Sequence, residues 1–232
     1  MKTIGLIGGM SWESTMPYYR IINETVRDRL GGLHSARIVL ISVDFHEIER
    51  LQSNGQWDEA GDLMADAARS LELAGADFIV LCTNTMHKVA HAIQSSVAIP
   101  MLHIADPTAA AIKRAGFSRI GLLGTRFTME QDFYRHRLEE QHGIEVLVPN
   151  DADRADVHRI IYDELCLGTV LPASRTLYRD IITRLVNRGA EAIILGCTEI
   201  SLLISASDVK TPLFDTTAIH ACHAAELALG DD

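Results

Sequence analysis

The chain has 232 residues, of which 47% are hydrophobic, 22% charged and 6% aromatic, a composition typical of globular proteins rather than of disordered, collagen-like or membrane chains. At about 150 residues per domain, this length fits either one large domain or two small ones. The formal net charge is −10 and no run of Lys or Arg interrupts the sequence, which argues against a nucleic-acid partner. No apolar stretch approaches the roughly 18 residues that span a bilayer, so we expect no membrane partner either.

The predicted elements alternate along the chain. Short β-branched runs that end in small or polar residues are followed by longer segments of helical periodicity, a pattern typical of βαβ units and parallel sheets. The fold class is therefore α/β. We expect strands at residues 3–7, 37–43, 78–81, 101–104, 119–123, 145–148, 192–195 and 212–214. We expect helices at residues 16–29, 57–75, 88–95, 106–115, 130–141, 154–166, 174–187 and 217–229.

The two halves of the chain resemble each other. Residues 4–11 are echoed by residues 120–125, and residues 74–83 by residues 188–198. The offsets are nearly constant, 116 residues for the first pair of segments and 114 for the second. This regularity favours a duplication into two lobes of similar fold, although any parallel sheet supplies similar strand sequences.

Polar residues follow the predicted strands at residues 8–11, 82–85, 125–128 and 197–199. Ligands of parallel sheets bind beyond the carboxyl ends of the strands, so two facing lobes would place these segments around one cleft. The glycines after the first strand do not follow the G-x-G-x-x-G spacing, and the P-loop spacing is absent, which disfavours a nucleotide. Loop amides at a helix N-terminus could instead hold a small carboxylate.

The four cysteines, Cys82, Cys166, Cys197 and Cys222, are widely spaced and form no C-x-x-C pair. The N-terminus resembles a first strand rather than a signal peptide, so we expect free thiols in a cytoplasmic protein. A buried apolar role is the default for each thiol. Cys197 differs because it lies in a turn directly after an apolar strand. We expect a helix N-terminus there to lower its pKa below about 8.5 and to favour the thiolate.

The histidines give a weaker signal. His87 and His91 have the i, i+4 spacing of one helix face, and residues 220–223 read His-Ala-Cys-His. Neither group has a complete ligand set, so we expect solvated or capping histidines and no metal.

Four short motifs resemble the cofactor-independent aspartate/glutamate racemase family: GGMS at residues 8–11, NT at 84–85, LLGT at 122–125 and GCTE at 196–199. The resemblance runs nearly end to end. It implies two pseudo-symmetric α/β lobes with the active site between them, no pyridoxal phosphate or other cofactor, no metal, and a homodimer. The family's C-terminal helix returns to the first lobe, which implies a first lobe of residues 1–105 with 207–232 and a second lobe of residues 106–206.

The family removes and returns a proton at the α-carbon of an amino acid with two acid/base groups. Its first-lobe signature is Cys-Asn-Thr, whereas here Thr83 precedes Asn84 and Cys82 comes one residue early. The signature pairs Thr83 with Cys197, and the internal repeat pairs Cys82 with Cys197. We favour Thr83, since a slip of one residue at a strand end turns the side chain to the opposite face; Cys82 would then point into its lobe. A hydroxyl is a weaker acid and base than a thiol, so the two directions should differ in rate.

The resemblance also implies the substrate-binding residues and a departure in specificity. Aspartate racemases carry a lysine where Cys166 stands here, and Arg50, Gln52 or Lys88 could compensate for the lost cation. The expected substrate is glutamate or aspartate, or a broader set that includes homoserine. The substrate-binding residues implied by the family are Met10, Ser11, Gln52, Asn84, Thr85, Thr125, Thr128, Thr198 and Glu199.

Two other functions remain open. A single second-lobe cysteine resembles the arrangement in arylmalonate decarboxylases and maleate isomerases, which belong to the same superfamily. A weakened first-lobe base would also suit a non-catalytic amino-acid sensor. In each case the negative net charge repels an acidic ligand, so local amides and helix N-termini must supply the binding.

Overall fold

The computed structural model describes residues 1–230 and separates them into two compact units. Unit 1 consists of Met1–Ile104 together with the C-terminal residues from His220 onward, and unit 2 consists of Ala105–Ile219. The chain passes from unit 1 to unit 2 after Ile104, one residue earlier than the predicted boundary after residue 105. The return to unit 1, predicted at residue 207, comes at His220 because the last strand pairs within the sheet of unit 2.

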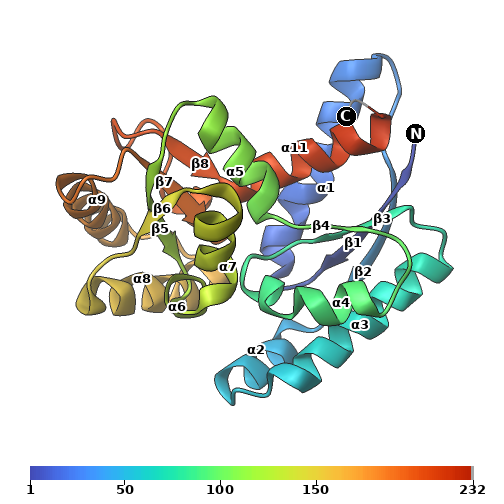
Figure 1. The fold of residues 1–232 in the computed structure, drawn as a ribbon, viewed down its shortest axis with the longest axis horizontal. Coiled ribbons are helices and arrows are strands. Elements are labelled where there is room, and N and C mark those ends of the chain that lie inside the picture. Colours follow the sequence, from blue (N-terminus) through green and yellow to red (C-terminus); the bar gives the residue numbers. More distant parts are fainter. Residues whose placement is uncertain (231–232) are drawn as a thin grey trace. The chain divides into compact units, whose positions relative to one another are not determined.

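Unit 1 contains a parallel sheet in the order β2-β1-β3-β4 (Figure 1). Its strands are β1 (Thr3–Gly8), β2 (Arg37–Ser42), β3 (Phe78–Leu81) and β4 (Met101–Leu102). Its helices are α1 (Trp12–Leu30), α2 (Phe45–Ser53), α3 (Trp57–Leu73), the 3₁₀ turn η1 (Thr85–Val89) and α4 (Ala90–Ser95). Most of helix α11 (Thr216–Leu229) also belongs to this unit.

Unit 2 contains a second parallel sheet, in the order β6-β5-β7-β8. Its strands are β5 (Arg119–Gly124), β6 (Glu145–Leu147), β7 (Ala192–Gly196) and β8 (Leu213–Asp215). Its helical segments are α5 (Ala105–Arg114), α6 (Arg126–Glu130), α7 (Asp132–His136), the π-helical η2 (Arg137–Gln141), α8 (Asp151–Asp163), the 3₁₀ turn η3 (Leu165–Leu167), α9 (Pro172–Asn187) and α10 (Ile200–Leu203).

The two sheets have the same strand order once β1 to β4 are matched with β5 to β8. The predicted α/β class is confirmed, and each of the eight predicted strands is present with ends within two residues. Because both the order and the parallel direction repeat, the similarity of the two halves of the sequence reflects a repeated fold rather than shared strand vocabulary.

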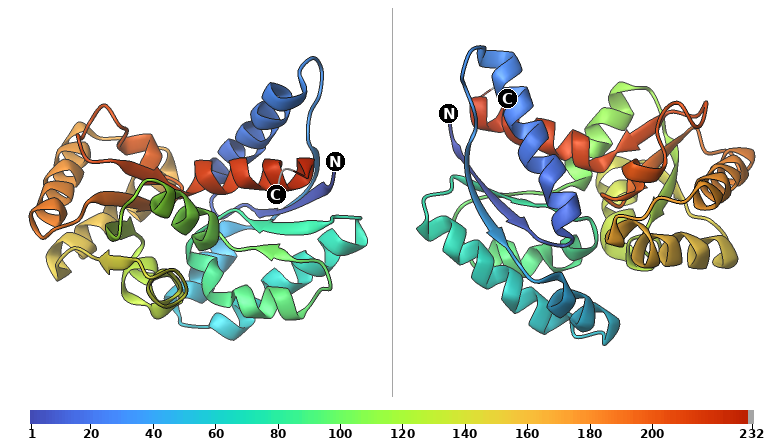
Figure 2. Two further views of the ribbon diagram at one scale, coloured as in Figure 1. Left: turned by 45° about the horizontal axis from the view of Figure 1, so that its top comes forward. Right: turned by 180° about the vertical axis from the view of Figure 1, so that it is seen from behind.

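Helices cover both faces of the sheet in unit 1. Alternate residues of β1 and β3, such as Ile7 and Leu81, pack against α2 and α3. The intervening residues, such as Leu6 and Val80, pack against α1 and α11, which cross next to each other in both views of Figure 2. Side chains of a strand alternate between faces, so a strand buried on both faces reads as a continuous apolar run.

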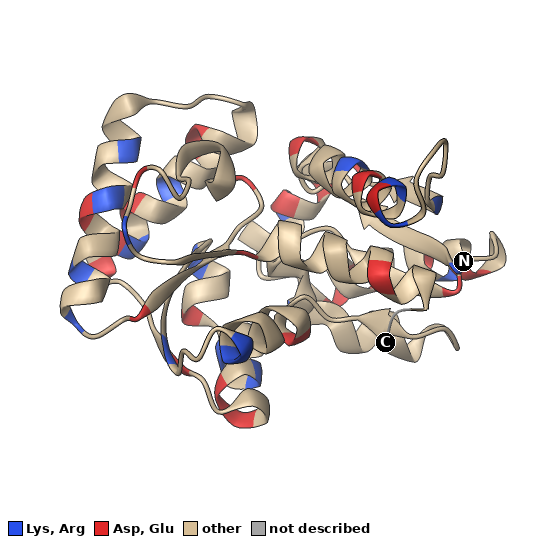
Figure 3. Ribbon diagram, turned by 90° about the horizontal axis from the view of Figure 1, so that it is seen from above, with Lys and Arg blue, Asp and Glu red and all other residues tan. Residues whose placement is uncertain are grey.

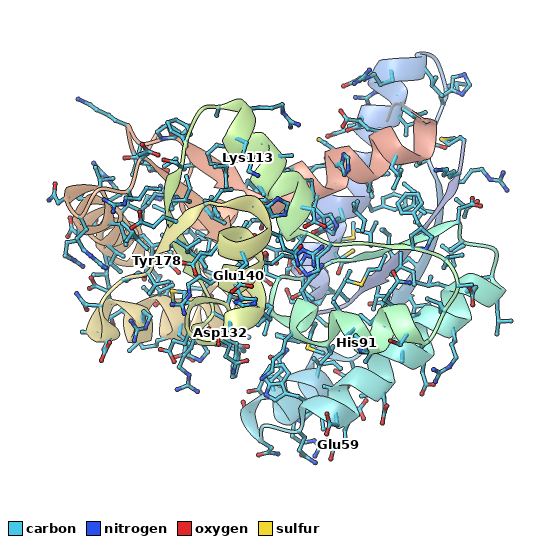
Figure 4. All side chains as sticks on the ribbon, viewed as in Figure 1. Glu59, His91, Lys113, Asp132, Glu140 and Tyr178 are labelled. Carbon is cyan, nitrogen blue, oxygen red and sulfur yellow. The ribbon has the colours of Figure 1, made fainter. Side chains whose placement is uncertain are left out.

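In unit 2, the β7 residues Ile193 and Leu195 face a core that α8 and α9 complete. Tyr178 of α9, labelled in Figure 4, is fully buried there and donates a hydrogen bond to the carbonyl oxygen of Val157. Ile194 of the same strand, on the opposite face of the sheet, is also fully buried. Both units therefore bury their central strands, apart from Arg119 at the start of β5, and connecting loops follow the carboxyl ends of these strands.

Capping residues explain several helix starts. Asp44 accepts a hydrogen bond from the amide of His46 at α2, and Asn150 accepts one from the amide of Asp153 at α8. Helix α9 begins at Pro172, whose missing amide hydrogen costs nothing at a first helical position. The caps at Asp44 and Asn150 end the loops that follow strands β2 and β6, so they help to set the geometry of these two strand-end loops.

The structure differs from the predicted helices in three places. Helix α2 was not predicted, and neither was the short α10. The segment 130–141, predicted as one helix, is interrupted near Gln131, whose extended backbone separates α6 from α7. Thr125 caps α6 with its side chain, so α6 starts at the strand end as a separate turn rather than as part of a longer helix.

The distribution of charge and the hydropathy of the helices agree with what the composition predicts. Lys and Arg are interspersed with Asp and Glu along the helices (Figure 3). Within residues 1–230, none of the helices is both long and apolar enough to cross a membrane.

Candidate active site

The register of the two sheets matches Thr83 with Cys197. In unit 1, Ile7 of β1 pairs with Leu81 of β3, and in unit 2 the equivalent Leu123 pairs with Leu195 of β7. Thr83 and Cys197 each lie two residues beyond these leucines. The internal-repeat alternative, in which Cys82 matches Cys197, is off by one residue: Cys82 corresponds to Gly196.

Cys82 and Thr83 have different surroundings at the end of β3. The Cys82 side chain is 0% exposed and packs in the apolar core beside α1 and α11, and this burial raises the pKa of its thiol. The expectation that Cys82 points into its unit is confirmed. Thr83, which retains 8% exposure, lies at the next position, where the side chain turns to the opposite face. Cys82 is thus a core residue, and Thr83 is the polar group at this strand end.

The loop after β1 lies beside the end of β3, because the two strands are neighbours in the sheet. Gly9 has a positive φ of 91°, and a Cβ atom there would meet the backbone oxygen of Val43 at 2.2 Å. Only glycine fits this turn. The turn delivers Met10 and Ser11, both buried, to the start of α1, where the Ser11 carbonyl oxygen accepts a hydrogen bond from Ser14 Oγ at 2.8 Å.

Three further predicted binding residues in unit 1 lie in one neighbourhood. Asn84 and Thr85 follow Thr83 and are buried. Gln52 of α2 is buried as well, and its Nε2 contacts the sulfur of Met86 at 3.1 Å, directly after Thr85. Unit 1 therefore brings together the five predicted binding residues Met10, Ser11, Gln52, Asn84 and Thr85 at the carboxyl ends of β1 and β3.

In unit 2, the predicted residues also gather at two adjacent strand ends. Gly124 of β5 pairs with Gly196 of β7, and a Cβ on Gly124 would approach the carbonyl oxygen of Gly196 to 2.8 Å. Thr125 follows, caps α6 by accepting from the amide of Thr128 at 3.3 Å, and lies 3.2 Å from Thr128 Oγ1. Two threonine hydroxyls thus lie at the end of β5, next to the segment that carries Cys197.

Glu199 is directed at the cysteine that precedes it. Cys197 Sγ donates to Glu199 Oε2 at 2.9 Å, and Thr198 Oγ1 donates to the same oxygen at 2.6 Å. Cys166 Sγ of η3 approaches Glu199 Oε1 at 3.8 Å. The carboxylate therefore accepts hydrogen bonds from the thiol and from the neighbouring hydroxyl, and all three residues Cys197, Thr198 and Glu199 are buried.

The predicted low pKa of Cys197 is wrong. Burial is the main cause that raises the pKa of this thiol well above its ordinary value, and the negative charge of Glu199 raises it further. Helix α10 has only four residues, so its dipole is small compared with a full carboxylate in contact with the thiol. Burial and the neighbouring carboxylate therefore both favour the neutral thiol of Cys197, which donates to Glu199, over the thiolate.

Cys166 also has a raised pKa, because of burial and then of the charge of Glu199. Of the residues considered as replacements for the lysine of aspartate racemases, Lys88 holds its Nζ 3.9 Å from the centroid of the Trp57 ring. Arg50 is exposed on α2. Gln52 is buried beside Met86, next to the end of β3.

The histidines were predicted to be solvated or capping, and this is wrong for two of them. His87 and His220 are 2% and 0% exposed. His91, labelled in Figure 4, lies on the neighbouring helix α4 and contacts Ser95 at its exposed side. Among residues 1–230, no group of three or more His, Cys, Asp or Glu side chains is arranged to hold a metal ion.

Two neighbours of the candidate residues were missed in the sequence: the contact of Cys166 with Glu199, and the hydrogen bond from His87 to the carbonyl oxygen of Thr83. The four-residue spacing from Thr83 to His87 was a usable signal for the second, because it matches one helical turn. No spacing in the sequence indicates the first contact, since Cys166 is 33 residues from Glu199.

The comparisons with known proteins cover nearly the whole chain. The family model Asp/Glu/Hydantoin racemase matches residues 7–224. A crystal structure of a candidate Asp/Glu racemase from Yersinia pestis is 61% identical, with a TM-score of 0.92 over 99% of this chain and 100% of that one.

Two further relatives extend this similarity. An aspartate racemase homologue from Pyrococcus horikoshii OT3 is 38% identical, with a TM-score of 0.85 over 99% of this chain and 100% of that one. The broad specificity amino-acid racemase RacX of Bacillus subtilis is 26% identical over 93% of both chains. The chain therefore belongs to the Asp/Glu/hydantoin racemase family, and its relatives support the assignment of this chain as an amino-acid racemase.

Proposed function

We propose that this protein is a cofactor-independent amino-acid racemase in which Thr83 and Cys197 act on opposite faces of the same α-carbon. The observation that carries the proposal is the register of the sheets, which sets both residues two positions beyond matched leucines of equivalent strands. Family membership supports the reaction class. The chemistry uses side chains of this chain alone and assigns no step to a bound cofactor.

The Cys197 half of the reaction follows from its contact with Glu199. Proton transfer across the 2.9 Å contact from Sγ to Oε2 would give a thiolate and a neutral carboxylic acid. The thiolate then takes the α-proton: the C–H bond breaks, its electron pair remains on the α-carbon, and an S–H bond forms. Holding only one negative charge on the pair lowers the cost of forming this base in a buried place.

The Thr83 half delivers a proton to the other face of the α-carbon, either from the hydroxyl itself or through a water that the hydroxyl holds. In the reverse direction the same group receives the α-proton. A hydroxyl is much less acidic than a thiol, so we expect this half to be the slower one. The equilibrium between the enantiomers is unaffected, since a catalyst changes only rates.

For the substrate we propose glutamate and aspartate, with homoserine as a neutral competitor. Glutamate and aspartate share an α-carboxylate that the loop amides and the hydroxyls of Ser11, Thr85, Thr125 and Thr198 are suited to bind. Cys166 supplies no positive charge for a distal carboxylate where aspartate racemases have a lysine, which favours a broad specificity. In keeping with the family resemblance, we further propose a cytoplasmic homodimer.

The test is deuterium exchange. The protein is incubated in D2O with each enantiomer of glutamate, aspartate and homoserine, and the α-proton is followed by NMR while chiral chromatography measures inversion. We expect loss of the α-proton signal together with inversion. Strict preference for aspartate would contradict the broad specificity but not the reaction.

Two other outcomes identify the alternatives. Binding without exchange would indicate an amino-acid sensor and overturn the racemase. Release of carbon dioxide from an arylmalonate, with no exchange of amino acids, would indicate a decarboxylase that uses Cys197 alone. The second alternative is supported by the presence of a thiol at only one of the two matched positions, at Cys197 but not at Thr83.

A further inference from the structure

Thr83, the weaker of the two proposed acid/base groups, is held by a buried histidine. His87 of η1 is 2% exposed, and its Nδ1 lies 2.8 Å from the carbonyl oxygen of Thr83. Its Nε2 lies 3.1 Å from the backbone nitrogen of Ile104, the last residue of unit 1 before the chain enters unit 2. The imidazole therefore connects the end of β3 with the segment that leaves the unit.

The partners of His87 fix its tautomer. The amide of Ile104 can only donate, so Nε2 accepts and carries no proton. The carbonyl oxygen of Thr83 can only accept, so Nδ1 carries the proton and donates it to this hydrogen bond. Both ring nitrogens are satisfied by the neutral form, and a proton added at Nε2 would displace the Ile104 hydrogen bond.

The backbone of Thr83 is held on both sides. Its amide donates to the carbonyl oxygen of Leu81 at 2.9 Å, and its carbonyl oxygen accepts from His87. The amide of the preceding Cys82 continues the β1–β3 pairing by donating to Ile7 at 2.9 Å. Both peptides that flank Thr83 are therefore fixed, and the hydrogen bond from His87 is a side-chain contact that holds the one on its carbonyl side.

A second histidine stabilises the first without touching Thr83. The rings of His87 and His220 lie 6.0 Å apart edge to face. His220 accepts from the hydroxyl of Tyr18 at 2.9 Å through Nδ1 and donates to the carbonyl oxygen of Leu102 at 3.1 Å through Nε2. His220 therefore offers a matched control, because it is a buried histidine of the same cluster whose ring nitrogens bond Tyr18 and Leu102.

We propose that His87 is a positioning residue for Thr83, which aligns the hydroxyl of Thr83 through the Nδ1 hydrogen bond to its backbone. This inference rests on the proposed function, because it assigns His87 to one half of a two-base reaction. A weak acid/base needs close alignment with the reacting carbon, and a misplacement of about 1 Å can cost on the order of a hundredfold in rate. Cys197 has its own partner in Glu199, so His87 acts on the Thr83 half alone.

Replacing His87 by Asn or by Gln separates the functions of its two ring nitrogens. In His87→Asn the amide nitrogen takes the place of Nδ1 and keeps a donor for the Thr83 carbonyl oxygen. In His87→Gln the amide oxygen takes the place of Nε2 and keeps an acceptor for Ile104, but the donor to Thr83 is lost. His220→Gln removes the acceptor for Tyr18 and serves as the control for lost packing and lost hydrogen bonds in the same cluster.

The readout is α-proton exchange in D2O, started separately from each enantiomer of glutamate. We expect His87→Gln to slow exchange from one enantiomer by roughly tenfold or more and to leave exchange from the other within about twofold of the wild-type rate. His87→Asn and His220→Gln should leave the ratio of the two exchange rates unchanged. In the unaltered protein, ¹⁵N NMR should show His87 neutral with its proton on Nδ1.

Several results would overturn the inference. An equal loss from both enantiomers in His87→Gln would indicate a structural role, and so would the same loss in His220→Gln. If His87→Gln does not fold, a proton on Nε2 of His87 in the ¹⁵N spectrum of the unaltered protein would contradict the geometry by itself. Absence of exchange from either enantiomer in the unaltered protein would be a failure of the proposed racemase, whereas exchange from both with a symmetric loss in His87→Gln would count against His87 alone.

Discussion

The carboxyl ends of β3 and β7 occupy equivalent places in two sheets of the same order, yet they present different chemistry. At the end of β7, the thiol of Cys197 contacts the carboxylate of Glu199, two residues along the chain. At the end of β3, the hydroxyl group belongs to Thr83, whose backbone is held by His87. The repeated fold preserves the position of the group, whereas the partner that tunes or aligns it differs between the two units.

This comparison shows why strand register is a better guide to equivalent residues than the identity of the neighbouring residues. Both strand ends contain a cysteine followed by a threonine, and matching these letters pairs Cys82 with Cys197. The register of the sheets shifts that match by one residue, which makes Thr83 the equivalent of Cys197 and leaves Cys82 in the core of unit 1. A shift of one residue in a strand reverses the face of the side chain, so the two matches predict different acid/base groups.

The largest effect is expected at the end of β7. Replacement of Cys197 by Ser, which keeps the shape but removes the thiol, should lower racemisation by roughly a thousandfold, because general acid–base groups contribute about 10² to 10⁴ in rate. Chiral chromatography of the products of L- and D-glutamate measures the loss. Racemisation within a few-fold of the unaltered protein would contradict a role for this thiol.

A smaller loss is expected at the end of β3. Thr83→Val keeps the shape of the side chain and removes the hydroxyl, and it should lower racemisation by about a hundredfold. Thr83→Ser keeps the hydroxyl and is the matched control. Thr83→Cys places thiols at both equivalent positions and should racemise at least as fast as the unaltered protein. Full activity of Thr83→Val would show that this strand end supplies no acid/base group.

The third prediction concerns the Glu199 carboxylate. Its negative charge raises the pKa of Cys197, so Glu199→Gln should lower this pKa and shift alkylation of Cys197 by iodoacetamide toward lower pH. The shift is partial because burial, the larger cause, remains. Mass spectrometry of the Cys197 peptide against pH measures the shift.

A suitable control for that experiment is Glu164→Gln. Glu164 is another buried carboxylate of unit 2, but it accepts a hydrogen bond from Ser174 rather than from a cysteine. Its replacement should leave the alkylation profile of Cys197 in place. An unchanged or upward shift in Glu199→Gln would contradict the electrostatic effect of the Glu199 carboxylate on the thiol.

The smallest effect is expected at Cys82. Its thiol is fully buried among apolar residues, so Cys82→Ala should cost about 1 kcal/mol in the free energy of unfolding and leave racemisation within about twofold. Urea unfolding and the chiral assay measure the two quantities. Loss of racemisation in Cys82→Ala together with full activity in Thr83→Val would reverse the assignment at this strand end.

Much of the fold follows from local patterns in the sequence. The eight strands were predictable because parallel strands buried on both faces are continuous apolar runs, and β1 and β3 illustrate this. The unpredicted helix α2 is short, and the local signal for its start is the N-cap at Asp44. The return of the chain to unit 1 could not be located because β8 has only three residues, and its pairing with β7 is a long-range contact.

The candidate residues could be predicted more fully than their environments. The motifs placed Thr83 and Cys197 at strand ends, but the pKa of Cys197 depends on which way the side chain of Glu199 turns. The burial of His87 and His220 depends on helix α11 returning to unit 1, which brings together residues more than 100 positions apart. Such long-range packing leaves no periodic signal in the sequence.

The central claim is that two groups, one at each strand end, remove the α-proton from opposite enantiomers. It is tested most directly by measuring deuterium exchange from L- and D-glutamate separately in Cys197→Ser and Thr83→Val. We predict a crossed pattern, in which each variant loses exchange from one enantiomer and the two variants lose it from different ones. Loss of exchange from the same enantiomer in both variants, or from both enantiomers in Cys197→Ser with none in Thr83→Val, would contradict the account.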